Sequence, residues 1–268
     1  MESVSFQGER GAYGEAAAAG FFGACSTVPC RTFADALGAV TGGRASHAVI
    51  PVENSLEGSV GESHDLLYRT GLRVSGEIYH RIEHCLIGGG TLEEARTVYS
   101  HPQALGQCRR FIEEKGLRTI PTYDTAGSVR IVRELGRRDC ACIASEAASA
   151  IHGVPVIARG IADEPGNTTR FLVLSGSCPP PSGRDKTSLI FSIRHEPGSL
   201  CRLLEAFHGG GINLTKIESR PSGGGGSWEY NFYVDIEGHA DDPAVRAALD
   251  GAAREAVSSK VLGSYPAA

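Results

Sequence analysis

The sequence predicts an α/β protein made of two folded parts. Segments of strand and helix character alternate from residue 4 to residue 159, an order typical of parallel strands covered by helices on both faces. Residues 175–185 are rich in proline, glycine and serine, which indicates a linker. After the linker, residues 186–265 follow the order βαββαβ of a ferredoxin-like domain.

In the first part, strands are expected wherever a short apolar run meets a turn, and helices where helix formers follow a cap. Strands are expected at residues 4–6, 48–52, 72–87 (one strand or two), 96–99, 117–123, 141–144, 155–159 and within 166–174. Helices are expected at residues 15–22, 33–40, 60–67, 102–115, 126–135 and from Ser145 to about residue 153. Thr32 and Ser145 are expected N-caps, and Pro102 lies in a first turn.

In the second part, the ferredoxin-like order follows from six segments. Strands are expected at residues 186–195, 212–219, 228–237 and 261–265, and helices at 198–208 and 243–258. The glycine-rich residues 222–227 indicate a flexible hairpin between the central strands. Trp228 begins the next strand and is expected in the core or at an interface.

Composition excludes several classes of function. The 268-residue chain is 41% hydrophobic with a net charge of -5, which argues against a nucleic-acid partner or an anionic membrane surface. No apolar run reaches the ~18 residues of a membrane-spanning helix, and the start lacks the features of a secretory signal. We therefore expect a cytoplasmic protein. Its eight cysteines are expected to be reduced, and their spacing gives no metal site.

Gly8, Gly11 and Gly14 follow the first strand and leave two interpretations open. Free N–H groups at the start of the next helix could bind an anion. Alternatively, the glycines serve only the backbone geometry of a tight turn.

Polar side chains stand just beyond several of the expected buried strands. Ligands in such α/β proteins sit at the carboxyl ends of the strands, so these side chains are candidates for a binding cleft. Ser100 and Thr125 have an alternative role as helix caps. The candidates are Glu53, Asn54, Ser55, Ser100, Gln107, Asp124 and Thr125.

The run at residues 166–174 is the most informative part of the chain. It takes a Gly-Asn loop through Thr168, Thr169, Arg170 and Phe171 into an apolar strand. Alternation along a strand points Thr169 and Phe171 to one side and Arg170 to the other. Phe171 can therefore wall a cleft beside Thr169, while Arg170 either reaches a carboxylate or fixes the loop.

Four motifs, at residues 8–13, 50–55, 100–105 and 166–171, resemble those of prephenate dehydratases and occur in the same order. Residues 197–204 and 218–221 resemble the Gly-Ala-Leu and Glu-Ser-Arg-Pro motifs of ACT regulatory domains. The resemblance covers nearly the whole chain. It implies a two-lobed, periplasmic-binding-protein-like catalytic domain at residues 1–177, a linker at 178–185 and an ACT domain at 186–268. With no helical segment before residue 1 to form a chorismate mutase, the chain resembles the monofunctional form.

The resemblance implies a carbon–oxygen lyase that converts prephenate to phenylpyruvate, in phenylalanine biosynthesis. Recovery of aromaticity drives this reaction, so no cofactor and no metal is expected. By resemblance, Thr169 assists the leaving hydroxyl. Glu53 and Asp124 support the cleft, although the family often has glutamate where Asp124 stands. Substrate binding is assigned by resemblance to Asn54, Ser55, Ser100, Gln107, Thr125, Arg170 and Phe171.

For the ACT part, the resemblance implies L-phenylalanine binding at the interface of a homodimer or homotetramer. Ser199 replaces the usual alanine, which leaves the effector open, and a module used only for assembly is the alternative. For the whole chain, an arogenate dehydratase and a non-catalytic two-lobed protein that binds a small anion remain alternatives. The expected effector-binding residues are Gly198, Ser199, Leu200, Asn213, Glu218 and Ser219.

Overall fold

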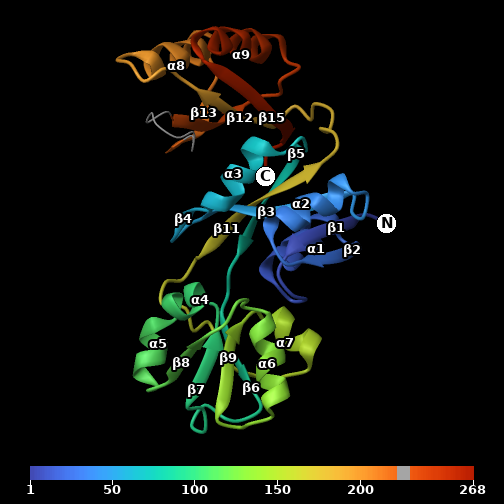
Figure 1. The fold of residues 1–268 in the computed structure, drawn as a ribbon, viewed down its shortest axis with the longest axis vertical. Coiled ribbons are helices and arrows are strands. Elements are labelled where there is room, and N and C mark those ends of the chain that lie inside the picture. Colours follow the sequence, from blue (N-terminus) through green and yellow to red (C-terminus); the bar gives the residue numbers. More distant parts are fainter. Residues whose placement is uncertain (222–229) are drawn as a thin grey trace. The chain divides into compact units, whose positions relative to one another are not determined.

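The computed structural model describes residues 1–221 and 230–268 (Figure 1). The expected hairpin at 222–227 and the strand start at Trp228 lie outside the described residues. The chain forms two compact units, one of residues 1–63 and 78–171 and the other of residues 64–77 and 172–268.

The first sheet has the strand order β2-β1-β3-β11-β5, with the short β4 paired to β3. β1 runs parallel to both β2 and β3. β5 and β11 each continue from one compact unit into the other. The elements are β1 (Ser3–Gln7), α1 (Tyr13–Phe22), β2 (Ser26–Cys30), α2 (Phe33–Thr41), β3 (His47–Asn54), β4 (Gly58–Ser59), α3 (Gly61–Arg69), β5 (Arg73–Arg81) and β11 (Thr168–Ser175).

The second sheet belongs to the first unit and has the strand order β10-β6-β9-β7-β8. Its elements are β6 (Cys85–Gly88), β7 (Thr97–Ser100), α4 (Pro102–Gln107), α5 (Arg109–Glu114), β8 (Arg118–Pro121), α6 (Gly127–Leu135), β9 (Cys140–Ala144), α7 (Glu146–His152) and β10 (Val156–Arg159).

The second sheet is mixed, whereas the alternation of strands and helices predicted mostly parallel strands. β7 is parallel to β8 and β9, but β6 is antiparallel to β9 and to β10. The chain enters this sheet through β6 directly after β5 and leaves it through β10 before β11. Helices connect β7, β8, β9 and β10 in turn, and these four strands run in one direction, as helical crossovers allow. β6 follows β5 without a helix and runs against them.

Local sequence signals set several element ends as expected. Thr32 forms a capping box with Asp35 at the start of α2, and the Ser145 hydroxyl caps α7. Pro102 occupies the first turn of α4. The helix expected at residues 102–115 is broken at Cys108 into α4 and α5.

The glycine turn after β1 serves close packing. Gly11 has φ +89°, and a Cβ there would lie 2.4 Å from the Cα of Ala148 in α7. The Gly11 N–H donates to the Glu15 carboxylate at 2.6 Å, so it is not free to bind an anion. The backbone-geometry interpretation therefore accounts for Gly11.

The second unit contains the expected βαββαβ order. Its sheet is antiparallel throughout, with the strand order β13-β14-β12-β15. Phe191 and Phe207 pack together in its core. The elements are β12 (Asp185–Ser192), α8 (Ser199–Gly209), β13 (Leu214–Pro221), β14 (Tyr230–Glu237), α9 (Pro243–Glu255) and β15 (Ser258–Pro266).

Residues 64–77, from α3 and β5, pack in the second unit. Lys260 Nζ donates to three backbone carbonyls at and just beyond the end of α3, at 2.6–3.0 Å, and so satisfies groups that a helix end leaves open. Glu77, whose side chain is fully buried, forms a 2.7 Å ion pair with Lys186.

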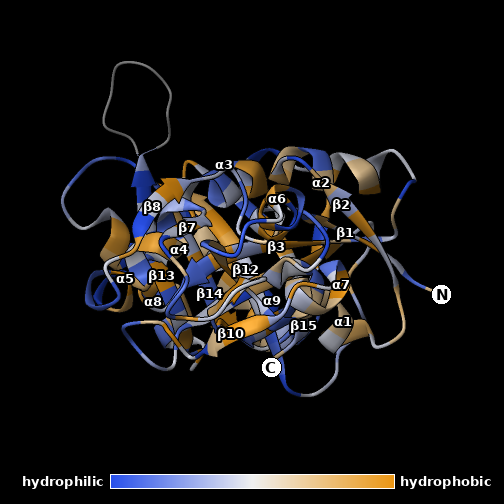
Figure 2. Ribbon diagram, turned by 90° about the horizontal axis from the view of Figure 1, so that it is seen from below, coloured by the Kyte–Doolittle hydropathy of each residue, from blue (hydrophilic) through white to orange (hydrophobic). Residues whose placement is uncertain are grey.

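The mostly buried strand β3 carries hydrophobic residues, which are coloured orange in Figure 2. Among the described residues, no helix combines the length and the apolar character needed to cross a membrane.

Candidate active site

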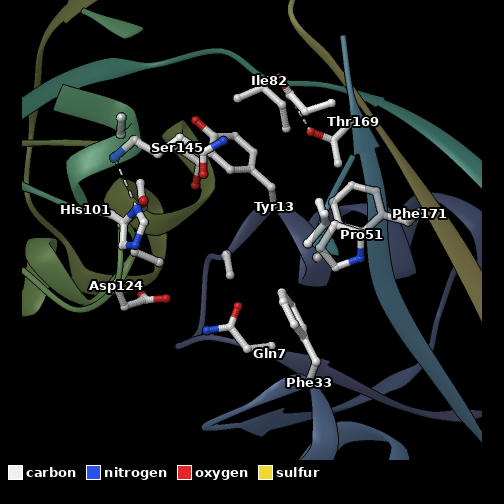
Figure 3. A pocket seen from close by; sticks show the side chains of 18 of the residues that line it. Gln7, Tyr13, Phe33, Pro51, Ile82, His101, Asp124, Ser145, Thr169 and Phe171 are labelled. Atoms are coloured by element: carbon white, nitrogen blue, oxygen red, sulfur yellow. Dashed lines mark hydrogen bonds between the residues drawn. The ribbon is translucent and has the colours of Figure 1, made fainter. Parts of the chain in front are cut away.

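A cavity of about 460 Å³ lies between the two sheets of the first unit (Figure 3). Its volume falls within the range of small-molecule sites. Figure 3 shows Thr169 and Phe171 on one wall and His101 and Asp124 on the opposite wall. Besides apolar residues, the lining includes Gln7, Tyr13, Arg31, Asn54, Glu62, His84, His101, Gln103, Gln107, Tyr123, Asp124, Thr125, Ser145 and Thr169.

Six of the residues singled out from the sequence line this cavity. They reach it from the end of β3, from α4, from the loop after β8 and from β11. They are Asn54, Gln107, Asp124, Thr125, Thr169 and Phe171.

Four other expected residues are not among the lining. Ser100 is fully buried and donates to the Ile143 carbonyl at 2.7 Å, which ties β7 to β9. The Ser55 hydroxyl accepts the N–H of Thr168 at 3.0 Å and so holds the start of β11.

Arg170 and Glu53 are the other two. Arg170 is buried on the side of β11 opposite to Thr169 and Phe171. Glu53 lies in β3, opposite Ser59 of β4.

The hydrogen bonds of Asn54 determine what the Thr169 hydroxyl can do. Asn54 Oδ1 accepts the N–H groups of Leu56 and Glu57 at 3.0 and 3.1 Å, which fixes which way the amide faces. Asn54 Nδ2 therefore points at Thr169 Oγ1, 2.9 Å away, and at Asn167 Oδ1, 2.6 Å away. An amide nitrogen only donates, so Thr169 Oγ1 is the acceptor here.

The consequence is that Thr169 keeps its own hydrogen for another acceptor. No acceptor for this hydrogen stands within hydrogen-bond distance in the described part of the chain. Thr169 lines the cavity and is 8% exposed. The site thus presents an oriented, mostly buried hydroxyl donor to a bound molecule.

Asp124 is the buried carboxyl group of the opposite wall. Burial raises its pKa, while the Gly127 N–H, which donates to Oδ1 at 2.6 Å, acts in the other direction. Its Oδ2 would lie 3.0 Å from a Cβ at Gly8. The glycine turn after β1 therefore lets the wall carrying Asp124 approach closely.

His101 stands beside Asp124 on this wall. Its Nδ1 accepts the N–H of Gln103 at 3.3 Å, so the neutral ring carries its hydrogen on Nε2.

The motifs missed several residues of the lining. Arg31 follows β2, a strand that the sequence did not predict, and forms no ion pair or hydrogen bond with any described residue. His84 lies in a short connection between β5 and β6 and belongs to none of the four motifs. Tyr13 stood inside the first motif, but nothing in the sequence pointed its ring at the cleft.

Within the described ranges, no three side chains of His, Cys, Asp or Glu come close enough together to hold a metal ion.

The second unit has a separate hollow of about 240 Å³ before α8. Gly198 and Leu200 line it, and Gly198 has φ +84°, which favours glycine. Ser199 is buried at the start of α8.

The other expected effector residues, Asn213, Glu218 and Ser219, are not among the lining of this hollow. Glu218 instead lies 3.3 Å from Lys216 Nζ and 3.4 Å from His64 Nε2.

Fold and site together define a class: an α/β enzyme domain of two lobes with a small-molecule cavity between its sheets, carrying a ferredoxin-like module. The family model for prephenate dehydratase matches residues 4–178, and the model for the ACT domain matches residues 187–254. The chain belongs to the prephenate dehydratase family.

Sequence similarity to members of this family covers almost the whole chain. It is 39% identical to a bifunctional N-acyl-homoserine lactone acylase/prephenate dehydratase of Komagataeibacter europaeus, across 98% of this chain and 95% of that protein. It is 41% identical to the chloroplastic arogenate dehydratase/prephenate dehydratase 2 of Arabidopsis thaliana, across 98% of this chain and 72% of that protein. The structure of prephenate dehydratase from Arthrobacter aurescens in complex with L-Phe superposes with a TM-score of 0.89, at 33% identity, over 99% of this chain and 90% of that one.

Proposed function

We propose that this protein converts prephenate to phenylpyruvate, with Thr169 assisting the departure of the ring hydroxyl. The observation that carries the proposal is the hydrogen bond from Asn54 to Thr169 Oγ1, which leaves the threonine hydrogen for the substrate. The ring carboxylate leaves as carbon dioxide, and its bonding electrons restore the aromatic ring. The C–O bond to the hydroxyl breaks, and the departing hydroxide takes up one proton from the solvent and leaves as water.

Thr169 suits this step as a hydrogen-bond donor rather than as an acid. A threonine hydroxyl is too weak an acid to transfer its proton in water. It can still stabilise the negative charge that grows on the departing oxygen, and an oriented, mostly buried donor does this without reorganisation. Phe171, on the same wall, supplies an apolar face for the ring that becomes aromatic.

The substrate carries two carboxylates, and the cavity offers groups to bind them. Arg31 brings a guanidinium that forms no ion pair with a described residue. Thr125 and Gln103 add polar groups to the lining. We assign one carboxylate to Arg31, because a guanidinium matches a carboxylate in geometry and in charge.

The ACT part is proposed to bind L-phenylalanine as an allosteric effector. The hollow beside Gly198 and Leu200 and the L-Phe complex of the Arthrobacter aurescens structure support this. We further propose a catalytic domain at residues 1–177, a linker at 178–185, an ACT domain at 186–268, assembly as a homodimer or homotetramer, and a cytoplasmic location.

Turnover of prephenate by the purified protein tests the proposal. Phenylpyruvate is followed by its ultraviolet absorbance in alkali, with and without L-phenylalanine, and phenylalanine formation from arogenate is measured in parallel. Turnover of prephenate that changes with L-phenylalanine supports both the reaction and the effector. Faster turnover of arogenate would replace the substrate, and no turnover of either would leave a binding protein.

A further inference from the structure

His84 lines the cavity but was not expected to take part in the site. It lies between β5 and β6, where the chain crosses from the first sheet to the second, and is 2% exposed. Beside it, the Ile82 N–H donates to the Asn167 carbonyl at 2.8 Å. The bond joins the outgoing crossing to the segment that returns into β11.

Gln107 fixes the tautomer of His84. The Gln107 Nε2 amide donates to the Glu57 carboxylate at 3.2 Å, so Gln107 Oε1 faces the other way, towards His84 Nε2 at 2.9 Å. That oxygen only accepts, and the hydrogen of the His84 ring must therefore be on Nε2. Nδ1 is then the nitrogen without a hydrogen. It faces the Tyr13 hydroxyl 2.9 Å away, and the single hydrogen of that hydroxyl is shared between Nδ1 and the Glu83 carbonyl at 2.7 Å. Burial lowers the pKa of His84, in keeping with a neutral ring.

From Gln107 the hydrogen bonds continue to the reactive hydroxyl. Asn167 Nδ2 donates to Gln107 Oε1 at 3.1 Å, and Asn54 Nδ2 donates to Asn167 Oδ1 at 2.6 Å. Asn54 then donates to Thr169 Oγ1 at 2.9 Å. Each amide in this chain has one possible orientation, because the bonds on either side of it are fixed.

We propose that His84 is a positioning residue that orients the Thr169 hydroxyl through Gln107, Asn167 and Asn54. The expected change in kcat for prephenate rests on the proposed function, whereas the expected orientation of the hydrogen bonds does not. If the Nε2 donor is lost, Gln107 Oε1 keeps only its bond to Asn167, and the positions of Gln107 and Asn167 loosen. Asn54 keeps the direction that the Leu56 and Glu57 N–H groups set, but its Nδ2 loses a firmly held partner in Asn167. The bond from Asn54 to Thr169 Oγ1, and with it the direction of the threonine hydrogen, is then less well defined.

Two variants of His84 distinguish the loss of its Nε2 donor from the loss of its size. In H84Q, the glutamine amide nitrogen stands near the place of Nε2 and can still donate to Gln107. In H84N, the shorter amide replaces Nδ1 instead and leaves Gln107 without its donor. We expect kcat for prephenate to fall about three- to tenfold in H84N, with KM little changed, because the effect reaches Thr169 through Asn54 and stays within the loss expected when Asn54 itself is removed. H84Q is expected to recover kcat to within about twofold of the wild type. Equal losses in both variants would overturn the proposal.

A double-mutant cycle tests whether His84 acts through Thr169. In a Thr169→Val background the hydroxyl is gone, so H84N is expected to reduce the residual kcat by less than about twofold. A loss in that background as large as that of H84N alone would show that His84 acts on something other than Thr169.

A spectroscopic measurement does not depend on turnover. In ¹⁵N-histidine-labelled wild-type protein, we expect the His84 ring at neutral pH to be the Nε2–H tautomer. In the Y13F variant, we expect the chemical shift of His84 Nδ1 to change. An Nδ1–H tautomer or a protonated ring would contradict the chain of hydrogen bonds, even in a protein that turns over prephenate. Wild-type protein that shows the expected tautomer without turnover would instead contradict the proposed function.

Discussion

Replacing Asn54 by aspartate is expected to reduce activity more than replacing it by alanine, although aspartate is the closer match in shape. Asn54 is 5% exposed and presents its Nδ2 to Thr169 Oγ1 and Asn167 Oδ1. Aspartate places an acceptor oxygen at that position. The Thr169 hydrogen then turns towards the carboxylate and is withdrawn from the substrate.

The size of each effect follows from the hydrogen bonds. In N54A, the Thr169 hydroxyl rotates freely and points at the substrate only part of the time, and we expect kcat to fall about 10-fold, or about 1.4 kcal/mol. In N54D, the hydrogen is held by a charge-assisted bond. The transition state then loses a donor outright, which is expected to lower kcat about 10²- to 10³-fold, or about 2.7–4 kcal/mol.

The assay is steady-state formation of phenylpyruvate by the two variants, with folding checked by thermal denaturation. N54D retains the acceptor for the N–H groups of Leu56 and Glu57, so the local turn should survive. Its buried carboxylate also faces Asn167 Oδ1 and is expected to lower the unfolding free energy by about 1–3 kcal/mol. A folded N54D that is as active as N54A, or more active, would refute the assigned direction of the hydrogen bond.

Three further predictions concern stability. Burial lowers the pKa of His84 below the ordinary histidine value of 6.5, so the unfolded chain binds a proton more readily than the folded one. The unfolding free energy should therefore fall as the pH drops below about 6.5. Urea titrations at pH 7.5 and 5.5 measure the loss, which should be smaller in H84Q. Gly11→Ala should destabilise by about 1–3 kcal/mol through overpacking, because the new Cβ would meet backbone at 2.4 Å. Gly23→Ala, with φ +66° and open space around it, should lose only about 1 kcal/mol in the same melting experiment; equal losses would argue against the close approach. Glu77→Gln removes the negative charge of a fully buried carboxylate that lies 2.7 Å from Lys186 Nζ and should lower the unfolding free energy by about 3–5 kcal/mol. An unchanged denaturation midpoint would contradict a stabilising pair.

Much of the fold could be predicted because its signals are local. Thr32, Pro102 and Ser145 mark helix starts through their own chemistry. β2 was missed because Pro29 interrupts its apolar pattern, and a strand tolerates proline only at the edge of a sheet, which is where β2 lies. The direction of β6 was missed because it depends on where the chain crosses between the sheets.

The site was predictable to the extent that motif residues also stand at the ends of strands. Asn54 and Thr169 reach one cavity for this reason. Ser100 stands at such an end too, but its hydroxyl is bonded to the Ile143 carbonyl, and no spacing in the sequence indicates such a bond. His84 and Arg31 come to the cavity through tertiary packing alone.

The central claim is that the hydroxyl of Thr169 assists the departure of the substrate hydroxyl. The most direct test compares kcat and KM for prephenate in Thr169→Val, which removes the hydroxyl, and Thr169→Ser, which keeps it. We predict a kcat about 10²- to 10³-fold lower in Thr169→Val, with KM changed less than about threefold, and a much smaller loss in Thr169→Ser. A folded Thr169→Val protein that retains the kcat of the wild type would contradict the account.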